Sequence, residues 1–181
     1  MSYSFNVAQF LVELARNPHY QNQIAHIAHL PEQAARYGEL SKPLPQALQD
    51  ALKTLGISQL YTHQAQAVET ARDGKIFVVV TATASGKTLC YHLPILERRL
   101  EEPGAKALYL YPTKALAQDQ LRGLLRLQEA GDMAFKCGTY DGDTASSTRS
   151  ALRDRADLIL TNPDMLHAGI LPSHAKWAHF F

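Results

Sequence analysis

The segment Ile76–Thr88 constrains the fold of this chain more than any other stretch. It begins with five apolar residues, Ile76–Val80, which are mostly β-branched and predict a parallel strand buried on both faces. The small residues Thr81–Ser85 come next, and a backbone that wraps phosphate oxygens needs small residues because its N–H groups must come close. Gly86 then permits a turn into a helix. The segment therefore predicts a buried strand that leads into a phosphate-binding loop.

Two residues after the turn carry the chemistry expected of such a loop. Lys87 supplies an ammonium for the β- and γ-phosphates of ATP, and Thr88 offers a hydroxyl to Mg²⁺ at the start of the helix. We therefore expect Lys87 and Thr88 to be catalytic, with Thr88 as the metal ligand. Thr81 replaces the first glycine of the Walker A pattern. The alternative is an ordinary strand-to-helix turn with an exposed lysine.

Composition excludes several other classes of protein. Apolar residues make up 46% and charged residues 19% of the 181 residues, which is an ordinary globular composition. The net charge of +1 gives no global basic field, so a polyanion must be held locally. Cys90 and Cys137 are too few for a structural zinc site, and they fit a reducing cytoplasm. We expect a cytoplasmic protein without a signal peptide or a membrane partner.

The N-terminal part differs in pattern from the rest. Apolar residues at helical spacing predict a helix over Val7–Leu14, which ends near Asn17 and Pro18. The two prolines of Lys42–Pro45 mark a boundary, so residues 1–45 are expected to form an N-terminal helical extension and residues 46–181 the main domain. A helix over Gln46–Leu55, capped by Gly56, opens that domain.

Beyond the loop, short apolar runs alternate with longer helical patterns. This alternation predicts an α/β fold with a parallel, doubly wound sheet and right-handed crossovers. The expected strands are Ala105–Tyr111, Phe135–Tyr140 and Asp157–Thr161, and the expected helices run from Thr113 to about Glu129, over Thr148–Arg155, and onward from Asn162 and Pro163.

Polar residues follow the strands, at the edge of the sheet where ligands of such folds bind. Thr113 and Asn162 each mark a helix start whose free N–H groups suit a nucleic-acid phosphate, although a residue of this kind taken alone is more often a simple cap. Gln64, upstream of the loop, has an amide that can pair with the edge of adenine. The alternative is an amide that merely lies on a helix surface.

Five segments in this order resemble the motifs of a superfamily-two helicase. The resemblance is strongest to the RecQ-related branch that carries a DUF1998 domain, and it spans nearly the whole chain. It implies a RecA-like first helicase lobe, with Gln64 in the Q motif, the loop as motif I and Pro112–Gln120 as motif Ia. The segments are Tyr61–Gln64, Thr81–Thr88, Tyr111–Gln120, Gly138–Thr144 and Thr161–His167.

The resemblance also implies the ligands and their residues. The chain is expected to be a fragment of an ATP-dependent DNA helicase that moves 3′ to 5′ and acts in DNA repair, with ATP and Mg²⁺ as cofactors and single-stranded DNA as the preferred partner. The implied nucleotide-binding residues are Tyr61, Gln64, Thr83, Ala84, Ser85, Gly86, Lys87 and Thr88. The implied nucleic-acid contacts are Thr113, Lys114, Gln118, Tyr140, Gly142, Asp143, Thr161, Asn162 and Asp164.

The chain departs from a helicase in what it lacks. No Asp-Glu-x-His tetrapeptide occurs, and neither a second lobe nor its arginine finger is expected before Phe181. We therefore expect a lobe truncated before motif II, from an engineered fragment, a gene fragment or a split reading frame, and inactive alone as an ATPase. Two alternatives stay open: a fragment of a DEAD-box RNA helicase, and a non-catalytic nucleotide or nucleic-acid binding module. The sequence leaves the oligomeric state open.

Overall fold

The computed structural model describes residues 6–29, 31 and 34–181, which divide into two units between Ala34 and Ala35. The first unit contains helix α1 (Val7–Ala15), which confirms the expected N-terminal helix. The Asn6 side chain caps α1, because its Oδ1 accepts a hydrogen bond from the Gln9 amide at 3.1 Å. Among the described residues of this unit α1 is the one helix, so most of the predicted extension is not helical.

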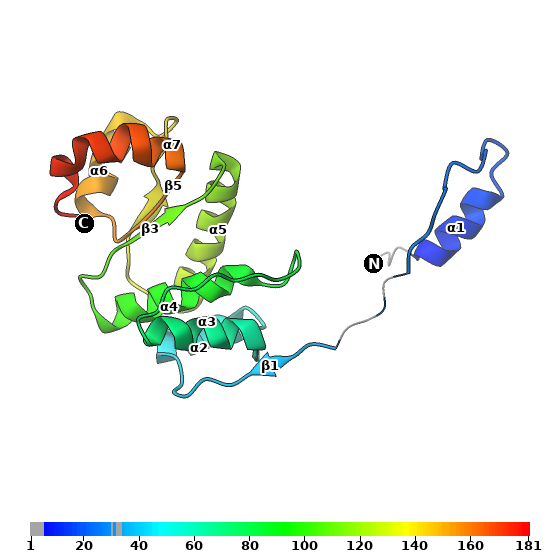
Figure 1. Ribbon diagram of the computed structural model, residues 1–181, viewed down its shortest axis with the longest axis horizontal. Coiled ribbons are helices and arrows are strands. Elements are labelled where there is room, and N and C mark those ends of the chain that lie inside the picture. The colour runs from blue at the N-terminus through cyan, green and yellow to red at the C-terminus, as the bar shows by residue number, and fades with distance from the viewer. Residues whose placement is uncertain (1–5, 30, 32–33) are drawn as a thin grey trace. The chain divides into compact units, whose positions relative to one another are not determined.

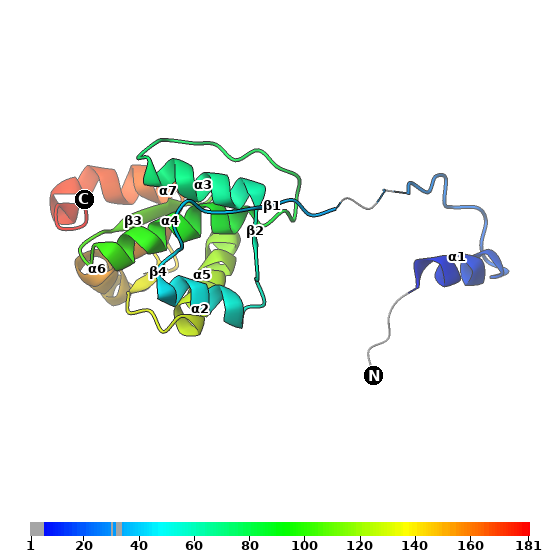
Figure 2. The ribbon, with the colours of Figure 1, turned by 90° about the horizontal axis from the view of Figure 1, so that it is seen from below.

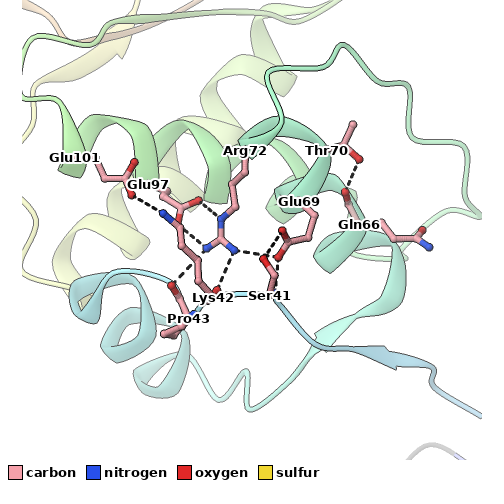
Figure 3. Close-up of polar contacts among 9 residues, drawn as sticks. All are labelled: Ser41, Lys42, Pro43, Gln66, Glu69, Thr70, Arg72, Glu97 and Glu101. Atoms are coloured by element: carbon pink, nitrogen blue, oxygen red, sulfur yellow. Dashed lines mark hydrogen bonds and ion pairs between the residues drawn. The ribbon is translucent and has the colours of Figure 1, made fainter.

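Residues 35–45 belong with the second unit, although the sequence pattern predicted a boundary at residue 45. Strand β1 (Tyr37–Gly38) pairs antiparallel with β2 (Leu60–Tyr61), and Leu44 is buried in the main core. Arg72, at the end of helix α3 (Thr62–Arg72), hydrogen-bonds the Lys42 carbonyl oxygen at 2.9 Å (Figure 3). This early segment is therefore fixed against the helices that follow it.

A parallel sheet lies at the centre of the second unit (Figure 1). Its strands are β3 (Ala107–Leu110), β5 (Leu158–Thr161) and β4 (Cys137–Thr139), in the order β3-β5-β4. Crossover helices join parallel strands, as the alternating pattern predicted. The α/β fold with a parallel sheet is confirmed, and Leu110, Thr139 and Thr161 bring the carboxyl ends of the three strands to one edge.

Both faces of the sheet are covered. Leu158 and Leu160 of β5 face a core built with helices α2 (Gln46–Thr54), α4 (Lys87–Glu101) and α5 (Lys114–Ala130). Ile159 faces the opposite way, into a second cluster that contains Trp177. Helices α6 (Ser146–Arg155) and α7 (Pro163–Met165), the π-helix η1 (Leu166–Ile170) and the 3-10 helix η2 (Leu171–Trp177) complete the order of elements. Because every residue of β5 is buried, its apolar run lacks alternation.

The predicted strand over Ile76–Val80 is wrong for this structure. Residues 75–82 form no strand, and the segment arches alongside α3 before it turns back into α4 (Figure 2). Ile76, Val78 and Val80 are 100%, 85% and 88% exposed. An apolar β-branched run forms a strand only when neighbouring strands pair with it, and β3 pairs only with β5 among the described residues.

The predicted helix caps are confirmed. Thr113 Oγ1 accepts a hydrogen bond from the Leu116 amide at 3.2 Å, and Asn162 Oδ1 accepts one from the Met165 amide at 2.8 Å. Pro163 follows Asn162 at the first helical position, where its missing N–H costs nothing. These caps start α5 and α7 directly after β3 and β5, so both helices begin at the edge of the sheet that the carboxyl ends of the strands form.

Candidate nucleotide and nucleic-acid site

The loop before α4 turns through two residues in left-handed conformations. Ala84 and Gly86 both adopt left-handed conformations, with φ of 58° and 75°. Gly86 is also the N-cap of α4, and a Cβ built on it would come within 2.6 Å of Gln64 Nε2. The positive φ therefore favours glycine at this position, and a larger residue would displace the Gln64 amide.

Lys87 is folded back over the loop in this structure. Its Nζ donates to the carbonyl oxygens of Ala82 and Thr81 at 2.6 and 3.1 Å, and it lies 3.4 Å from Ser85 Oγ. The ammonium thus already lies among oxygen acceptors, held by the backbone that leads into the helix start. Phosphate oxygens can replace these acceptors, because they bind an ammonium more strongly than neutral carbonyl groups do.

Thr81, which departs from the Walker A pattern, takes part in the same loop. Its hydroxyl lies 2.6 Å from Ser85 Oγ and 3.3 Å from Lys87 Nζ. The side chain therefore links the two ends of the turn, which a glycine could not do. In the sequence, Thr81 stood out only as a mismatch to the Walker A pattern. Its hydroxyl group was the one feature from which a hydrogen bond within the loop could have been predicted.

Gln64 anchors the loop to the start of α3. Its Oε1 accepts from the Tyr61 amide and its Nε2 donates to the Gly86 carbonyl oxygen, both at 2.9 Å. Gln64 is only 2% exposed, and Tyr61 is 38% exposed. One amide hydrogen and one lone pair of Gln64 remain for a further partner, but a base can reach them only if neighbouring side chains move.

The other predicted nucleotide residues lie at the same place in the chain but differ in exposure. Thr83 and Ala84 are exposed on the loop, while Ser85 and Thr88 are half-buried. Thr88 lies in the first turn of α4, where the positive end of the helix dipole favours anions. The residues therefore fit a nucleoside triphosphate, with the Lys87 ammonium and the partial positive charge of the helix start facing its phosphates.

A second group of predicted residues gathers at the carboxyl ends of β3 and β4. Lys114 Nζ lies 2.7 Å from Asp143 Oδ2, and Gln118 Nε2 donates to Thr139 Oγ1 at 2.7 Å. The Asp143 carboxylate holds the pKa of Lys114 above its ordinary value. These residues line a groove of about 530 Å³ between α5 and the segment after β4. Gly142 lies beside Lys114 in that segment.

Two predicted nucleic-acid residues are buried instead. Tyr140 is 8% exposed and meets the Trp177 ring edge-on at a centroid distance of 4.9 Å. Thr161 is 1% exposed, and its hydroxyl donates to the Tyr140 carbonyl oxygen at 2.6 Å. The Tyr140 side chain therefore belongs to the cluster around Trp177, and the Thr161 side chain joins the end of β5 to the residue after β4. Thr113 and Asp164 remain exposed beside the helix starts, and Asn162 is half-buried.

The turn after β4 is built around one carboxylate. Asp141 Oδ1 accepts hydrogen bonds from the amides of Asp143 and Thr144 at 2.9 and 3.0 Å, and from Thr144 Oγ1 at 3.0 Å. An aspartate that binds backbone amides two and three residues later forms a tight turn. Asp141 is therefore a structural residue that presents Asp143 to Lys114.

The second unit has a parallel sheet with helices on both faces, and the helix after the loop begins with Lys87. These features define the RecA-like class of α/β lobe. The DEAD/DEAH box helicase family model matches residues 61–180, and the chain belongs to this family. The match begins at Tyr61, on the last residue before α3.

Curated and solved relatives support the same assignment. The chain is 44% identical over 145 residues to the uncharacterized ATP-dependent helicase YprA of Bacillus subtilis, covering 78% of this chain and 19% of that protein. It is 39% identical to the ATP-dependent helicase hrq1 of Schizosaccharomyces pombe, covering 97% of this chain and 17% of the relative. Together with the similarity to the DUF1998 helicase MrfA, these relatives from a bacterium and a yeast confirm the resemblance to the DUF1998 branch.

The crystal structure of the DUF1998 helicase MrfA bound to DNA and AMPPNP is similar, with a TM-score of 0.85 and 37% identity. The alignment covers 97% of this chain and 24% of the MrfA chain. The chain therefore spans less than a quarter of the length of these relatives. No helix in the described part of the chain is long and apolar enough to cross a bilayer.

Proposed function

We propose that this chain binds ATP and Mg²⁺ at the loop before α4 as part of an ATP-dependent DNA helicase. The observation that carries the proposal is the position of Lys87. It is the first residue of the 15-residue helix α4, and its ammonium lies 2.6 Å from the Ala82 carbonyl oxygen of the loop. Lys87 and the first turn of α4 would hold the β- and γ-phosphates, and Thr88 would hold the metal. The metal would neutralise charge on the transferred phosphoryl group.

Nucleotide binding by Lys87 is tested by titration with a fluorescent ATP analogue. Lys87→Ala should weaken binding about ten- to a hundredfold, because a charge-assisted contact to phosphate is worth roughly 1.5–3 kcal/mol. Lys75→Ala is the matched control, since this lysine is exposed and paired with Asp73 at 2.9 Å, before the loop begins. Equal affinity of wild type and Lys87→Ala would rule out the loop as a phosphate site.

We further propose that single-stranded DNA binds across the carboxyl ends of β3, β4 and β5. The groove lined by Lys114 and Gln118 supports this placement, as does the similarity to MrfA, which was crystallised bound to DNA. The net charge of +1 predicts weak binding with a shallow salt dependence, since each contacted phosphate adds about 0.7 to the slope. The 3′ to 5′ direction and a role in DNA repair rest on the family resemblance alone.

Binding of labelled single-stranded DNA across a salt series tests this second site. The double variant Thr113→Ala with Asn162→Ala should bind more weakly, because both helix starts lose their capping side chain. An RNA of the same sequence is the comparison that tests the DEAD-box RNA alternative. Absence of DNA binding at low salt and high protein concentration would contradict the proposal.

We propose that the chain alone hydrolyses ATP no faster than background, even with DNA. An arginine finger contributes about 10³ to 10⁵ in rate, and a further acidic group normally completes the metal site. Within the described residues, no group of three or more histidine, cysteine or acidic side chains could hold a metal ion. Phosphate release above that of Lys87→Ala would contradict this expectation.

Since Cys90 and Cys137 are free thiols, we also propose a cytoplasmic location.

A further inference from the structure

His63 lies in the first turn of α3 and reaches the phosphate loop. Its Nε2 is 2.9 Å from the carbonyl oxygen of Ser85, 22 residues later in the chain. A carbonyl oxygen can only accept a hydrogen bond, so the Nε2 nitrogen must carry the proton and donate. The contact therefore fixes both the ring's hydrogen position and the direction of the Ser85 carbonyl.

The next residue of α3 makes the same kind of contact to the next peptide of the loop. Gln64 Nε2 donates to the Gly86 carbonyl oxygen at 2.9 Å. Two successive carbonyl groups of the loop are thus held by two successive side chains of α3. In a planar trans peptide the C=O and the following N–H point in opposite directions. The amides of Gly86 and Lys87 are therefore turned away from these two side chains.

Those two amides are the groups that a phosphate-binding loop offers to an anion. The loop needs to be held in this arrangement because Ala84, with a φ of 58°, is in a left-handed conformation that costs about 1–2 kcal/mol for a residue with a Cβ. A contact from outside the loop can offset this strain. Ser85 lies between the two left-handed residues, and its carbonyl is the point at which His63 acts.

The ring of His63 is itself held in place by a column of aromatic side chains. It stacks on Tyr61 with a centroid distance of 5.8 Å and an interplanar angle of 14°. Tyr61 stacks in turn on Tyr37 of β1 at 5.6 Å and 12°. These ring contacts favour the orientation in which Nε2–H is directed at the Ser85 carbonyl oxygen.

We propose that His63 is a positioning residue of the nucleotide site, which orients the Gly86 amide toward the phosphates by holding the Ser85 carbonyl. The inference rests on the proposed function, because it assigns a role in the same ATP site. It predicts that His63 acts on the triphosphate and not on the base, since its contact is to the phosphate loop.

Two variants separate the donor from the ring. His63→Phe keeps a ring that can stack on Tyr61 but removes the N–H, and His63→Gln places an amide donor near the position of Nε2. His174→Ala is the matched control, because this exposed histidine also contacts a backbone carbonyl, that of Leu171, at 3.2 Å in η2. Inorganic tripolyphosphate is the probe, with circular dichroism and thermal unfolding as the test of folding.

The expected result is that His63→Phe weakens tripolyphosphate binding about three- to tenfold, the effect of one hydrogen bond. His63→Gln and His174→Ala should stay within about twofold of wild type. In amide NMR spectra, the shift of the Gly86 resonance on adding tripolyphosphate should shrink in His63→Phe and return in His63→Gln. Unchanged binding by His63→Phe, or an equal loss in both His63 variants, would overturn the proposal.

A measurement on the wild type keeps the proposal testable if His63→Phe does not fold. Imidazole nitrogen NMR should show the neutral ring of His63 protonated at Nε2, and a ring protonated at Nδ1 would overturn the proposal. The proposed function fails separately: in that case wild type and Lys87→Ala bind tripolyphosphate equally, and the role of His63 falls with it. If Lys87→Ala loses binding while His63→Phe does not, only the role of His63 fails.

Discussion

The Arg72 guanidinium holds the Glu97 carboxylate with two hydrogen bonds, from Nε to Oε2 at 2.9 Å and from Nη2 to Oε1 at 2.6 Å. The pair joins the end of α3 to the middle of α4, and Arg72 also donates to Glu69 and to the Lys42 carbonyl (Figure 3). The hydrogen bonds to Glu97 raise the pKa of Arg72. One side chain therefore connects residues 42–43 to both α3 and α4, the helices on either side of the loop that contains Lys87.

Removing Arg72 should strongly destabilise the second unit. Arg72→Ala leaves the carboxylate of Glu97, 4% exposed, without its partner, which costs about 2–4 kcal/mol after allowance for the partial exposure of Arg72. Urea unfolding measures the change. The double variant Arg72→Met with Glu97→Leu should recover most of the lost stability, since no buried charge remains. A double variant no more stable than Arg72→Ala would contradict this account.

The buried His92 predicts a dependence of stability on pH. Burial lowers the pKa of His92 to about 4, while its ordinary value in an unfolded chain is 6.5. The unfolded state therefore binds a proton between these values and the folded state does not, so stability is complete above pH 6.5 and falls as the pH drops toward 4. Between pH 6.5 and pH 5 the loss is about 2 kcal/mol, at about 1.4 kcal/mol per unit.

Urea unfolding at a series of pH values checks this prediction. His92→Gln should flatten the dependence by one proton, because glutamine does not titrate and can still hydrogen-bond Tyr109, whose hydroxyl lies 3.1 Å from His92 Nδ1. His167→Gln, on an exposed position of η1, is the control and should leave the pH profile unchanged. The same profile in wild type and His92→Gln would show that another group carries the proton.

Base choice is the third prediction. Gln64→Ala should remove any preference for ATP over GTP, since recognition of an adenine edge by an amide is worth about 1–3 kcal/mol. It should also weaken both nucleotides, because the Gly86 carbonyl loses its partner at 2.9 Å. Competition binding separates the two effects, and Gln66→Ala, an exposed neighbour on α3, is the control. If wild type binds ATP and GTP equally, Gln64 does not recognise the base, and its role is limited to the hydrogen bond with the loop.

The segment 76–80 gives a fourth prediction. Ile76, Val78 and Val80 are almost fully exposed, and an unpaired apolar segment with strand propensity promotes association between chains. The triple variant in which Ile76, Val78 and Val80 are each changed to threonine should aggregate less, as measured by light scattering. Its thermal unfolding midpoint should not change. Phe77→Thr, at a half-buried neighbour, should instead lower the midpoint. A lower midpoint in the triple variant would show that these side chains are packed in solution.

Local signals in the sequence predicted the parts of the site that depend on near neighbours. The caps at Thr113 and Asn162 bond amides three residues away, and the loop turn at Gly86 is fixed by a single residue type. The pair of Arg72 and Glu97 joins residues 25 apart, so no spacing rule points to it. A side chain's partner in another helix depends on packing, which one sequence does not display.

The strand predicted at Ile76–Val80 shows that a correct local signal can still give a wrong prediction. Its apolar, β-branched composition is a correct signal of strand propensity, but a strand is defined by its hydrogen-bonded neighbours. Tyr140 and Thr161 show the same limit for function, because a position at a strand end does not reveal that the side chain is buried. Tyr140 is covered by Trp177, and Thr161 bonds the Tyr140 carbonyl oxygen. Propensity and position were visible in the sequence, whereas partners and burial required the structure.

The second core cluster has a consequence for synthesis of the protein on the ribosome. Ile159 of the central strand β5 is covered by Ile170, Trp177 and Phe180, which follow it in the chain. Tyr140 and Ala156 precede β5 and already cover part of this face. When β5 has just left the exit tunnel, the rest of the face is therefore uncovered until about twenty more residues emerge, at roughly 5–20 residues per second. During that interval a nascent chain exposes the surface that chaperones recognise, and a translational pause after β5 would prolong this exposure.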